Sequence, residues 1–172
     1  MKSKLRSMKE TDIELVLSWR NNPNISKYMY NQHLISLKEH KKWFFRSLES
    51  QYLELLIFEL DDQREGFMQF KIDHNNQKGE WGFYLSPNAT TGVGSIMGNH
   101  GLKYAFEKLQ LEYLFGEAME YNEKSIKFHR KLGFTIDKSF KKTHFDGKSY
   151  HNIIGFKYPL KDWEKNKLRR EF

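Results

Sequence analysis

One short segment constrains the fold more than any other part of the chain: an apolar strand-like run leads through a polar loop into two glycines and a helix. Residues 81–86 form the run, residues 87–91 the loop, and Gly92-Val93-Gly94-Ser95 the start of the helix. The first amides of a helix have no intrahelical acceptor, so they can bind a phosphate, and glycine lets that phosphate approach closely. The segment matches neither a Walker A loop nor a dinucleotide fingerprint, and taken alone it is also typical of an ordinary turn.

Hydrophobic periodicity and turn residues predict the other elements of the fold. We expect strands at 5–8, 53–60, 66–72, 80–86, 113–119, 134–141 and 150–158, and helices at 12–20, from Ser36 onward, at 92–109 and at 122–132. Capping boxes are expected at Thr11 with Glu14 and at Ser36 with Glu39. We attribute Gly98 and Gly101 to close packing of a helix on the sheet. This order predicts an α/β (α+β) fold with a mixed central sheet of about seven strands, helices on both faces and a parallel crossover between 80–86 and 113–119.

Composition narrows the class of protein. At 172 residues the chain is expected to be one domain, 1–172. It has no cysteine and no His-Glu-x-x-His arrangement, so no metal site is expected. No stretch resembles a membrane span or a signal peptide, which predicts a cytoplasmic protein with no membrane partner.

The formal charge of +7 makes an anionic partner plausible. The basic residues are dispersed, and residues 161–172 mix both signs, so we interpret that tail as a solvated surface. A nucleic-acid-binding module is the interpretation that the charge alone suggests. Because the chain lacks a recognisable RNA-binding or zinc-finger signature, no nucleic-acid partner is expected.

A second motif follows the phosphate loop by about 30 residues and reads Asn122-Glu123-Lys124-Ser125-Ile126-Lys127-Phe128-His129-Arg130-Lys131-Leu132-Gly133-Phe134. It resembles the pattern Asn-x-x-Ala/Ser-Ile-x-Phe-Tyr-x-Lys-x-Gly-Phe of the GNAT acyltransferases, and the two motifs stand in the order that this family uses. The resemblance implies a GNAT fold and an N-acetyltransferase that uses acetyl-CoA as co-substrate.

The resemblance also implies which residues bind the cofactor. In that family pantetheine enters between two diverging strands, and main-chain amides at a helix start hold the pyrophosphate. The positions implied here are the main chain of Tyr84 and Leu85, the loop residues Gly92, Val93, Gly94 and Ser95, and the side chains of Asn122 and Ser125. Asn122 also suits a helix cap, and one residue can do both. Ala89 departs from the family pattern, which prefers Gln or Arg there.

Two residues are candidates for proton transfer. Glu117, on the strand predicted beside the cleft, is the candidate base that takes the proton of the attacking amine, and a solvated strand residue is the alternative. His129 stands where many members of the family carry a tyrosine that protonates the leaving thiolate. An imidazole can serve as an acid near neutral pH, but a histidine on a partly buried helix face is also typical of a hydrogen-bonded core residue.

The N-terminal third narrows the acceptor. Residues 17–30 and 35–40 resemble the nucleotide-sugar N-acetyltransferases of pseudaminic acid biosynthesis. Those enzymes acetylate the 4-amino group of a UDP-linked 4-amino-4,6-dideoxy sugar used in flagellin glycosylation. A UDP-sugar presents a diphosphate and a flat base, which suit cationic and aromatic side chains. The residues implied for the acceptor are Arg20, Met29, Tyr30, His40, Lys71 and Tyr84.

Other functions stay open at this point. An N-terminal alanine acetyltransferase of the ribosomal-protein type would share the phosphate loop, and Ala89 with His129 also fit a catalytically silent family member. The expected partner is a small nucleotide sugar. A monomer and a homodimer are equally compatible with the sequence.

Overall fold

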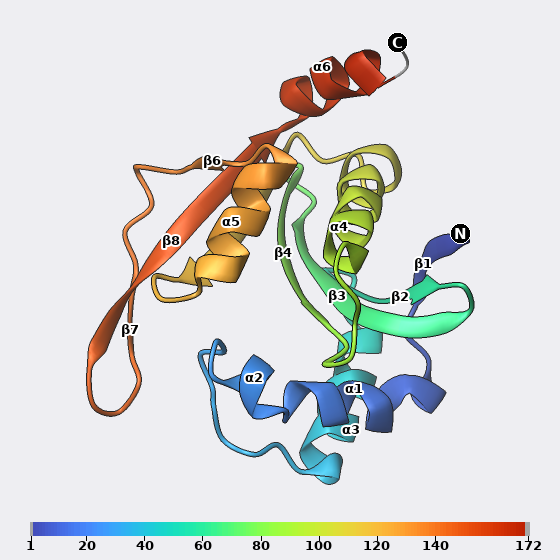
Figure 1. The fold of residues 1–172 in the computed structure, drawn as a ribbon, viewed down its shortest axis with the longest axis vertical. Helices are drawn as coiled ribbons and strands as arrows, with labels where there is room; N and C mark the ends of the chain where they lie inside the picture. Colours follow the sequence, from blue (N-terminus) through green and yellow to red (C-terminus); the bar gives the residue numbers. More distant parts are fainter. Residues whose placement is uncertain (1, 171–172) are drawn as a thin grey trace. The chain divides into compact units, whose positions relative to one another are not determined.

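The computed structural model describes residues 2–170, with side chains through Lys167. The chain divides into two compact units, one formed by residues 1–71 with 82–97 and the other by 72–81 with 98–172. The strands are β1 (Ser3–Ser7), β2 (Leu53–Leu60), β3 (Gln63–Asp73), β4 (Lys78–Leu85), β5 (Tyr113–Met119), β6 (Thr135–Ile136), β7 (Thr143–Phe145) and β8 (Tyr150–Pro159). The helices are α1 (Ile13–Arg20), α2 (Pro23–Ser26), α3 (Leu37–Leu48), α4 (Val93–Lys103), α5 (Glu123–Leu132) and α6 (Leu160–Arg170) (Figure 1).

The strands form one mixed sheet with the hydrogen-bonded order β1-β2-β3-β4-β5-β8-β6, and β7 pairs with β8. The β4–β5 pair is parallel, as the sequence predicts, and the β1–β2, β2–β3 and β5–β8 pairs are antiparallel. The expected fold class is therefore confirmed, with eight strands among the described residues where about seven were expected. The prediction of a single domain over 1–172 stays a prediction.

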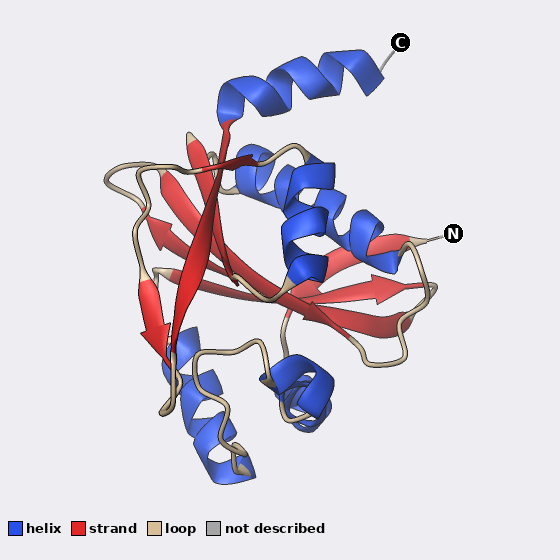
Figure 2. Ribbon diagram, turned by 60° about the vertical axis from the view of Figure 1, so that its left-hand side comes forward, coloured by secondary structure: helices blue, strands red, loops and turns tan. Residues whose placement is uncertain are grey.

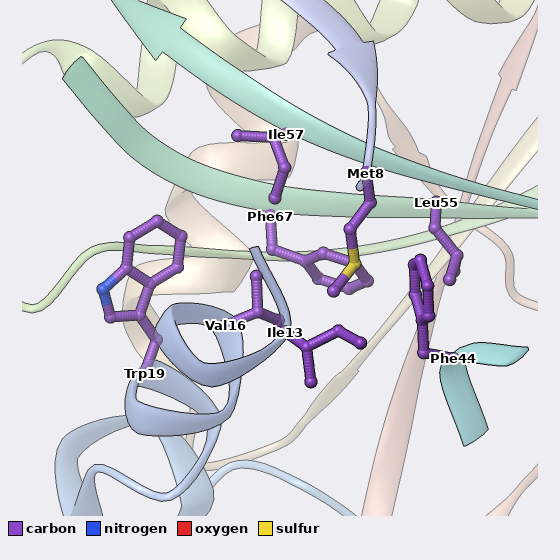
Figure 3. Close-up of a cluster of buried hydrophobic side chains, with 8 residues drawn as sticks. All are labelled: Met8, Ile13, Val16, Trp19, Phe44, Leu55, Ile57 and Phe67. Carbon is purple, nitrogen blue, oxygen red and sulfur yellow. The ribbon is translucent and has the colours of Figure 1, made fainter. Parts of the chain in front are cut away.

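In the first unit, the core lies between β2 and β3 and one face of each of the helices α1 and α3. Figure 3 shows the apolar side chains of these elements pointing toward one another. The cluster consists of Met8, Ile13, Val16, Trp19, Phe44, Leu55, Ile57 and Phe67, all at most 6% exposed. Ile13 and Val16 are three residues apart on α1, so helical periodicity brings both onto the face that meets the sheet.

The opposite face of the same strands meets the start of α4. Neighbouring residues of a strand point to opposite faces, so Gly66 faces away from the core that Phe67 enters. A Cβ at Gly66 would lie 2.6 Å from the sulfur of Met97, which leaves room only for glycine. Within this unit, helices therefore cover both faces of the sheet, as expected; in Figure 2, where the helices are blue, α1 and α3 lie on one side of the strands.

Helix α1 begins differently from the prediction. The predicted box of Thr11 with Glu14 is wrong, because residues 10–12 already form a 3₁₀ turn. The buried Asp12 carboxylate holds the start of that turn by accepting the amide of Lys9, the residue before it, at 2.8 Å, and it also accepts two hydrogen bonds from Arg6. Of the box predicted at Ser36 with Glu39, the Ser36 half is confirmed, since its hydroxyl accepts the Glu39 amide, while the Glu39 carboxylate accepts a hydrogen bond from His33.

In the second unit, α5 packs on β5 and β8. The His129 ring stacks on Phe156 of β8 at 4.3 Å, and a Cβ at Gly116 of β5 would lie 2.5 Å from His129 Nε2. Gly98 of α4 also meets α5, because a Cβ there would lie 2.7 Å from both Phe128 and Leu132. Gly98 was expected to pack against the sheet and instead allows two helices to approach.

Two further segments of this unit correct the sequence interpretation. The strand predicted at 134–141 ends at Ile136, because Asp137 accepts hydrogen bonds from the amide and hydroxyl of Ser139 and turns the chain. The tail interpreted as solvated forms α6, on which Trp163 is 7% exposed and stacks on Phe106. The helix predicted at 92–109 holds α4 and then a π-helical turn, Tyr104–Lys108.

Candidate active site

The phosphate loop has the predicted form in the first unit. β4 ends at Leu85, and α4 begins at Val93 after a turn whose last residue, Gly92, has a φ of 98°. Side chains rarely adopt that backbone conformation, so glycine is required there. A Cβ at Gly92 would meet no atom within 4 Å, so the loop is open on this side.

The main-chain donors of this loop are partly engaged within the loop itself. The Val93 amide donates to the Thr90 carbonyl at 3.3 Å and the Ser95 amide to the Gly92 carbonyl at 3.0 Å. Val93 was expected to offer its amide to a ligand, but its side chain is buried and its N–H already has this long hydrogen bond. Gly94, whose amide is the third of those expected to bind the pyrophosphate, is half-buried in the first turn of α4.

A second group of predicted residues gathers around Arg20, at the end of α1 in the same unit. One terminal nitrogen, Nη2, donates to the Asn31 carbonyl, while the buried Nη1 has no hydrogen-bond partner among the described residues. Burial lowers the pKa of the Arg20 guanidinium. Nη2 thus holds the guanidinium in place, while Nη1 stays unsatisfied. Because an unsatisfied buried donor costs about 1–3 kcal/mol, a ligand that accepts a hydrogen bond from Nη1 would be bound favourably.

His40 on α3 has the same property. Its side chain is 4% exposed, and its Nε2 finds no hydrogen-bond partner among the described residues. Burial and, next, the charge of Arg20 lower the pKa of His40, so its imidazole is neutral at physiological pH. The ring stacks on Trp43 with centroids 4.8 Å apart. Arg20, His40 and Trp43 thus combine two unsatisfied nitrogens with a flat aromatic surface.

Tyr84 on β4 belongs to the same group. Its ring packs against Phe67 at 5.1 Å, and burial raises the pKa of its phenol while the Arg20 charge acts in the opposite direction. The phenol therefore stays protonated and can act as a hydrogen-bond donor. We call Arg20, His40, Trp43 and Tyr84 the Arg20 cluster.

The other residues predicted for the acceptor are placed less tightly. Met29 is half-buried and Tyr30 is 43% exposed, both just after α2. Lys71 is exposed near the end of β3, opposite Leu53 of β2. The roles of these three side chains in binding the acceptor stay predictions.

In the second unit, Asn122 caps α5, as predicted. Its side-chain oxygen accepts the Ser125 amide at 3.1 Å, which leaves its NH₂ group as the donor that a ligand would meet. The backbone carbonyl of Ser125 in turn accepts a hydrogen bond from His129 at 2.8 Å. Asn122 and Ser125 therefore form one capping turn, and their contact with the cofactor stays a prediction.

The contacts of His129 correct its predicted role as an acid. The side chain is 1% exposed, and burial lowers the pKa of His129 to about 4. Trp81 can only donate, so its indole N–H gives a hydrogen bond to His129 Nε2 at 3.0 Å and the ring proton stays on Nδ1, which donates to Ser125. A neutral imidazole with both nitrogens engaged is not a proton donor for a thiolate at neutral pH, so the alternative of a core residue is favoured.

Glu117 lies on β5 with 16% of its side chain exposed. Its Oε2 accepts a hydrogen bond from Lys142 Nζ at 2.8 Å. Gly116 before it faces α5, so Glu117 points to the opposite face of the sheet. The sequence motifs do not point to Lys142 or Trp43 as functional residues. Trp43 could have been found as the aromatic residue three positions after His40, whereas nothing in the sequence links Lys142 to Glu117.

Comparisons with known proteins agree with this description. The model of the acetyltransferase (GNAT) domain family matches residues 3–135. The chain is 35% identical to the acetyltransferase PseH of Campylobacter jejuni over 75% of this chain and 82% of that protein. It is 24% identical to the spermidine N(1)-acetyltransferase of Escherichia coli, over 88% of this chain and 82% of that protein. A spermidine N-acetyltransferase from Vibrio cholerae, solved with CoA and spermine, superposes with a TM-score of 0.86 at 17% identity and covers 94% of this chain and 97% of that chain.

The chain therefore belongs to the GNAT acetyltransferase family. It is an N-acetyltransferase, and acetyl-CoA is its acetyl donor. The interpretation as a nucleic-acid-binding module is set aside by this assignment. Within the described residues there is no group of three or more side chains suited to hold a metal ion, and no helix long and apolar enough to cross a membrane.

Proposed function

We propose that the acceptor is a UDP-linked 4-amino-4,6-dideoxy sugar and that the enzyme acetylates its 4-amino group. The Arg20 cluster is the observation that carries this proposal. Its unsatisfied Arg20 Nη1 and His40 Nε2 are donors or acceptors that call for a polar ligand, and Trp43 and Tyr84 supply aromatic surface beside them. A nucleotide sugar offers diphosphate oxygens to the guanidinium and a planar base to an aromatic ring.

The similarity to the PseH acetyltransferase supports the same proposal, since the resemblance of the N-terminal third to the pseudaminic acid enzymes includes Arg20 and His40, and Tyr84 also fits it. Met29, Tyr30 and Lys71 complete the proposed set of acceptor-binding residues. We further propose that the amides of Gly92 to Ser95, the main chain of Tyr84 and Leu85, and the Asn122 and Ser125 side chains bind acetyl-CoA. Gly92, open on the side where a Cβ would stand, fits that role.

A polyamine acceptor is the second candidate, because two of the similar proteins are spermidine acetyltransferases by name. The charges of the Arg20 cluster argue against it. A polyamine is a multiply charged cation, and a buried guanidinium repels it at short range. A site for a polyamine needs several carboxylates. Among the groups whose charge acts on Arg20, Glu39 is the acidic side chain.

The proposed chemistry needs a neutral amine that attacks the thioester carbonyl. Acetyl-CoA supplies the thioester. Glu117 accepts the proton of the acceptor amine, a carbon–nitrogen bond forms as the carbon–sulfur bond breaks, and the departing thiolate takes a proton from solvent. His129 has no step in this scheme; it orders the first turn of α5 through its hydrogen bond to Ser125.

The direct test is a thiol-release assay with acetyl-CoA and a panel of acceptors: a UDP-4-amino-4,6-dideoxy sugar, spermidine, and peptides with an N-terminal alanine. We expect turnover with the nucleotide sugar at least about tenfold above the others, because a satisfied charged hydrogen bond contributes about 1.5–3 kcal/mol. Preference for spermidine would replace the proposal by its second candidate, and preference for the peptides would support the N-terminal acetyltransferase alternative.

Calorimetric titration with UDP tests the role of Arg20 separately. We expect Arg20→Ala to weaken UDP binding about tenfold or more, since the guanidinium is the buried cation of the cluster. Arg46→Ala, an exposed arginine on α3, is the matched control and should bind UDP as the wild type does. Equal affinity in Arg20→Ala and the wild type would remove Arg20 from the nucleotide site.

A further inference from the structure

The segment that joins β6 to β7 is fastened across β8, beside the strand that carries Glu117. At its start the Asp137 amide donates to the Gly155 carbonyl at 2.8 Å, and at its end the Ile153 amide donates to the Lys142 carbonyl at 3.0 Å. Between them Phe140 covers Gly155, where a Cβ would lie 2.5 Å from its ring. We call residues 137–142 the strap.

The strap and Glu117 lie on one face of the sheet. Gly155 is the partner of Glu117 in the antiparallel β5–β8 ladder, and residues directly opposite each other point to the same face. Phe140 therefore covers the position beside Glu117, and Lys142 brings its ammonium to within 2.8 Å of the carboxylate. The side chain of Glu117 is 16% exposed and that of Lys142 is 45% exposed, so the lysine is the partner that can move out into solvent.

We propose that Lys142 is an internal substitute for the acceptor amine. In the resting enzyme its ammonium pairs with the carboxylate of Glu117, and the protonated amine of an acceptor must displace it. This inference rests on the proposed role of Glu117 as the proton acceptor. Lys142 is thus a positioning and specificity-determining residue. Since an amine that no other contact holds competes poorly with a tethered ammonium, the strap selects acceptors that further contacts already bind firmly.

The fold gives this arrangement a mechanical basis. The strap is held by hydrogen bonds of its main chain and by the contact of Phe140 with Gly155. The Lys142 side chain can therefore move away from Glu117 without breaking these contacts. The Glu117 carboxylate then pairs with the ammonium of the acceptor in place of that of Lys142. A proton passes from the acceptor ammonium to Glu117, and Lys142 keeps its own proton throughout.

Steady-state kinetics with the UDP-4-amino sugar test the inference. Lys142→Met keeps the apolar stem and removes the charge, so we expect the KM for the amine to fall by up to about fivefold, the range of a partly exposed ion pair, with kcat little changed. Lys142→Arg should restore the wild-type KM, and Lys141→Met, at the exposed neighbouring position, should leave it unchanged. A residue that only supports the strap would raise KM or lower kcat on substitution, so an unchanged or higher KM in Lys142→Met overturns the inference.

The same kinetics in a Glu117→Gln background give the coupling between the two residues. If Lys142 acts through the carboxylate, Lys142→Met should no longer lower the KM once Glu117 is replaced. An equal fall of KM in both backgrounds would show that Lys142 acts elsewhere and would overturn the inference.

A labelling experiment does not depend on turnover and separates this inference from the proposed function. We expect acetic anhydride to modify Lys142 more slowly in the wild type than in Glu117→Gln, and the UDP-4-amino sugar to accelerate modification in the wild type. Lys141 serves as the internal reference. Equal labelling in all three samples overturns the inference, whereas absence of turnover with every amine, together with protected Lys142, overturns the proposed function and leaves the ion pair standing.

Discussion

At the scale of single residues, the buried hydrogen bond between Trp81 and His129 explains why β5 has a glycine at its centre. A Cβ at Gly116 would lie 2.5 Å from His129 Nε2 and 2.8 Å from Trp81 Nε1, so it would occupy the space between the two partners. The sequence motif predicted a histidine near the chemistry. It could not show that the ring faces Trp81, because that contact joins residues 48 positions apart.

We therefore expect Gly116→Ala to lower the free energy of unfolding by about 2–4 kcal/mol, through overpacking and loss of a buried hydrogen bond. Chemical denaturation measures this change. Gly82→Ala is the control on β4, since its Cβ would meet only the movable end of Gln69, at 3.3 Å. A loss in Gly116→Ala no larger than that in Gly82→Ala would contradict the contact.

The buried imidazole of His129 also predicts a pH dependence of stability. The pKa of His129 is about 4 in the folded protein and about 6.5 in an unfolded chain, so the unfolded state binds the proton first as the pH falls. The stability from keeping this ring neutral is fully present above pH 6.5 and is lost as the pH falls toward 4, by about 3 kcal/mol over that window.

Unfolding free energies at pH 4 to 7.5 test this prediction by comparison of wild type with His129→Gln. His40 and His100 also have a lowered pKa and contribute in the same direction, so the difference between the two proteins is the quantity to compare. We expect a smaller pH slope in the variant. His33→Gln, at an exposed position, is the control, and equal slopes in wild type and His129→Gln would contradict the prediction.

At the scale of elements, the sequence predicted best those segments whose signals are local. β2 and β5 have the predicted bounds because their apolar runs end at turn residues. Ser36 precedes α3 as its predicted cap, because such a cap depends only on a residue three positions along the chain. The strand predicted at 134–141 failed because Asp137 turns the chain through its side chain. The C-terminal helix was missed because its strongly polar sequence gave no apolar stripe. It is held by the stacking of Trp163 on Phe106 and by hydrogen bonds from Asn166 to Tyr158 and from Lys167 to Glu107.

The cap of α5 combines a structural and a proposed functional role. Asn122→Ala removes the acceptor of the Ser125 amide, so we expect a loss of about 1 kcal/mol in stability together with a KM for acetyl-CoA raised severalfold. Ser36→Ala, which removes the equivalent cap of α3, should lose similar stability without changing that KM. Denaturation and steady-state kinetics measure the two quantities. An unchanged KM in Asn122→Ala would leave it a cap alone.

At the scale of the whole molecule, the proposed functional groups are divided between the two units. The first holds the phosphate loop and the Arg20 cluster, and the second holds Glu117, Asn122 and the strap. The predictions for the loop at Gly92 and for Asn122 came from sequence motifs, since each lies on one continuous segment. The unsatisfied nitrogens of Arg20 and His40, and the pairing of Glu117 with Lys142, depend on distant segments and required the structure.

The net charge of the chain, +7, gives a test of the acceptor at this same scale. A positively charged protein attracts a nucleotide sugar and repels a polyamine, and salt screens both effects, with a Debye length of about 10 Å at 0.1 M and about 3 Å at 1 M. If the acceptor is a UDP-4-amino sugar, its KM should rise severalfold between low and high salt, because diphosphate binding loses its attraction. A polyamine acceptor should show a constant or falling KM over the same range. Acetyl-CoA is itself an anion, so its KM should rise in either case and serves as the internal control. If the KM for acetyl-CoA rises while that for the nucleotide sugar does not depend on salt, recognition through the Arg20 charge is contradicted.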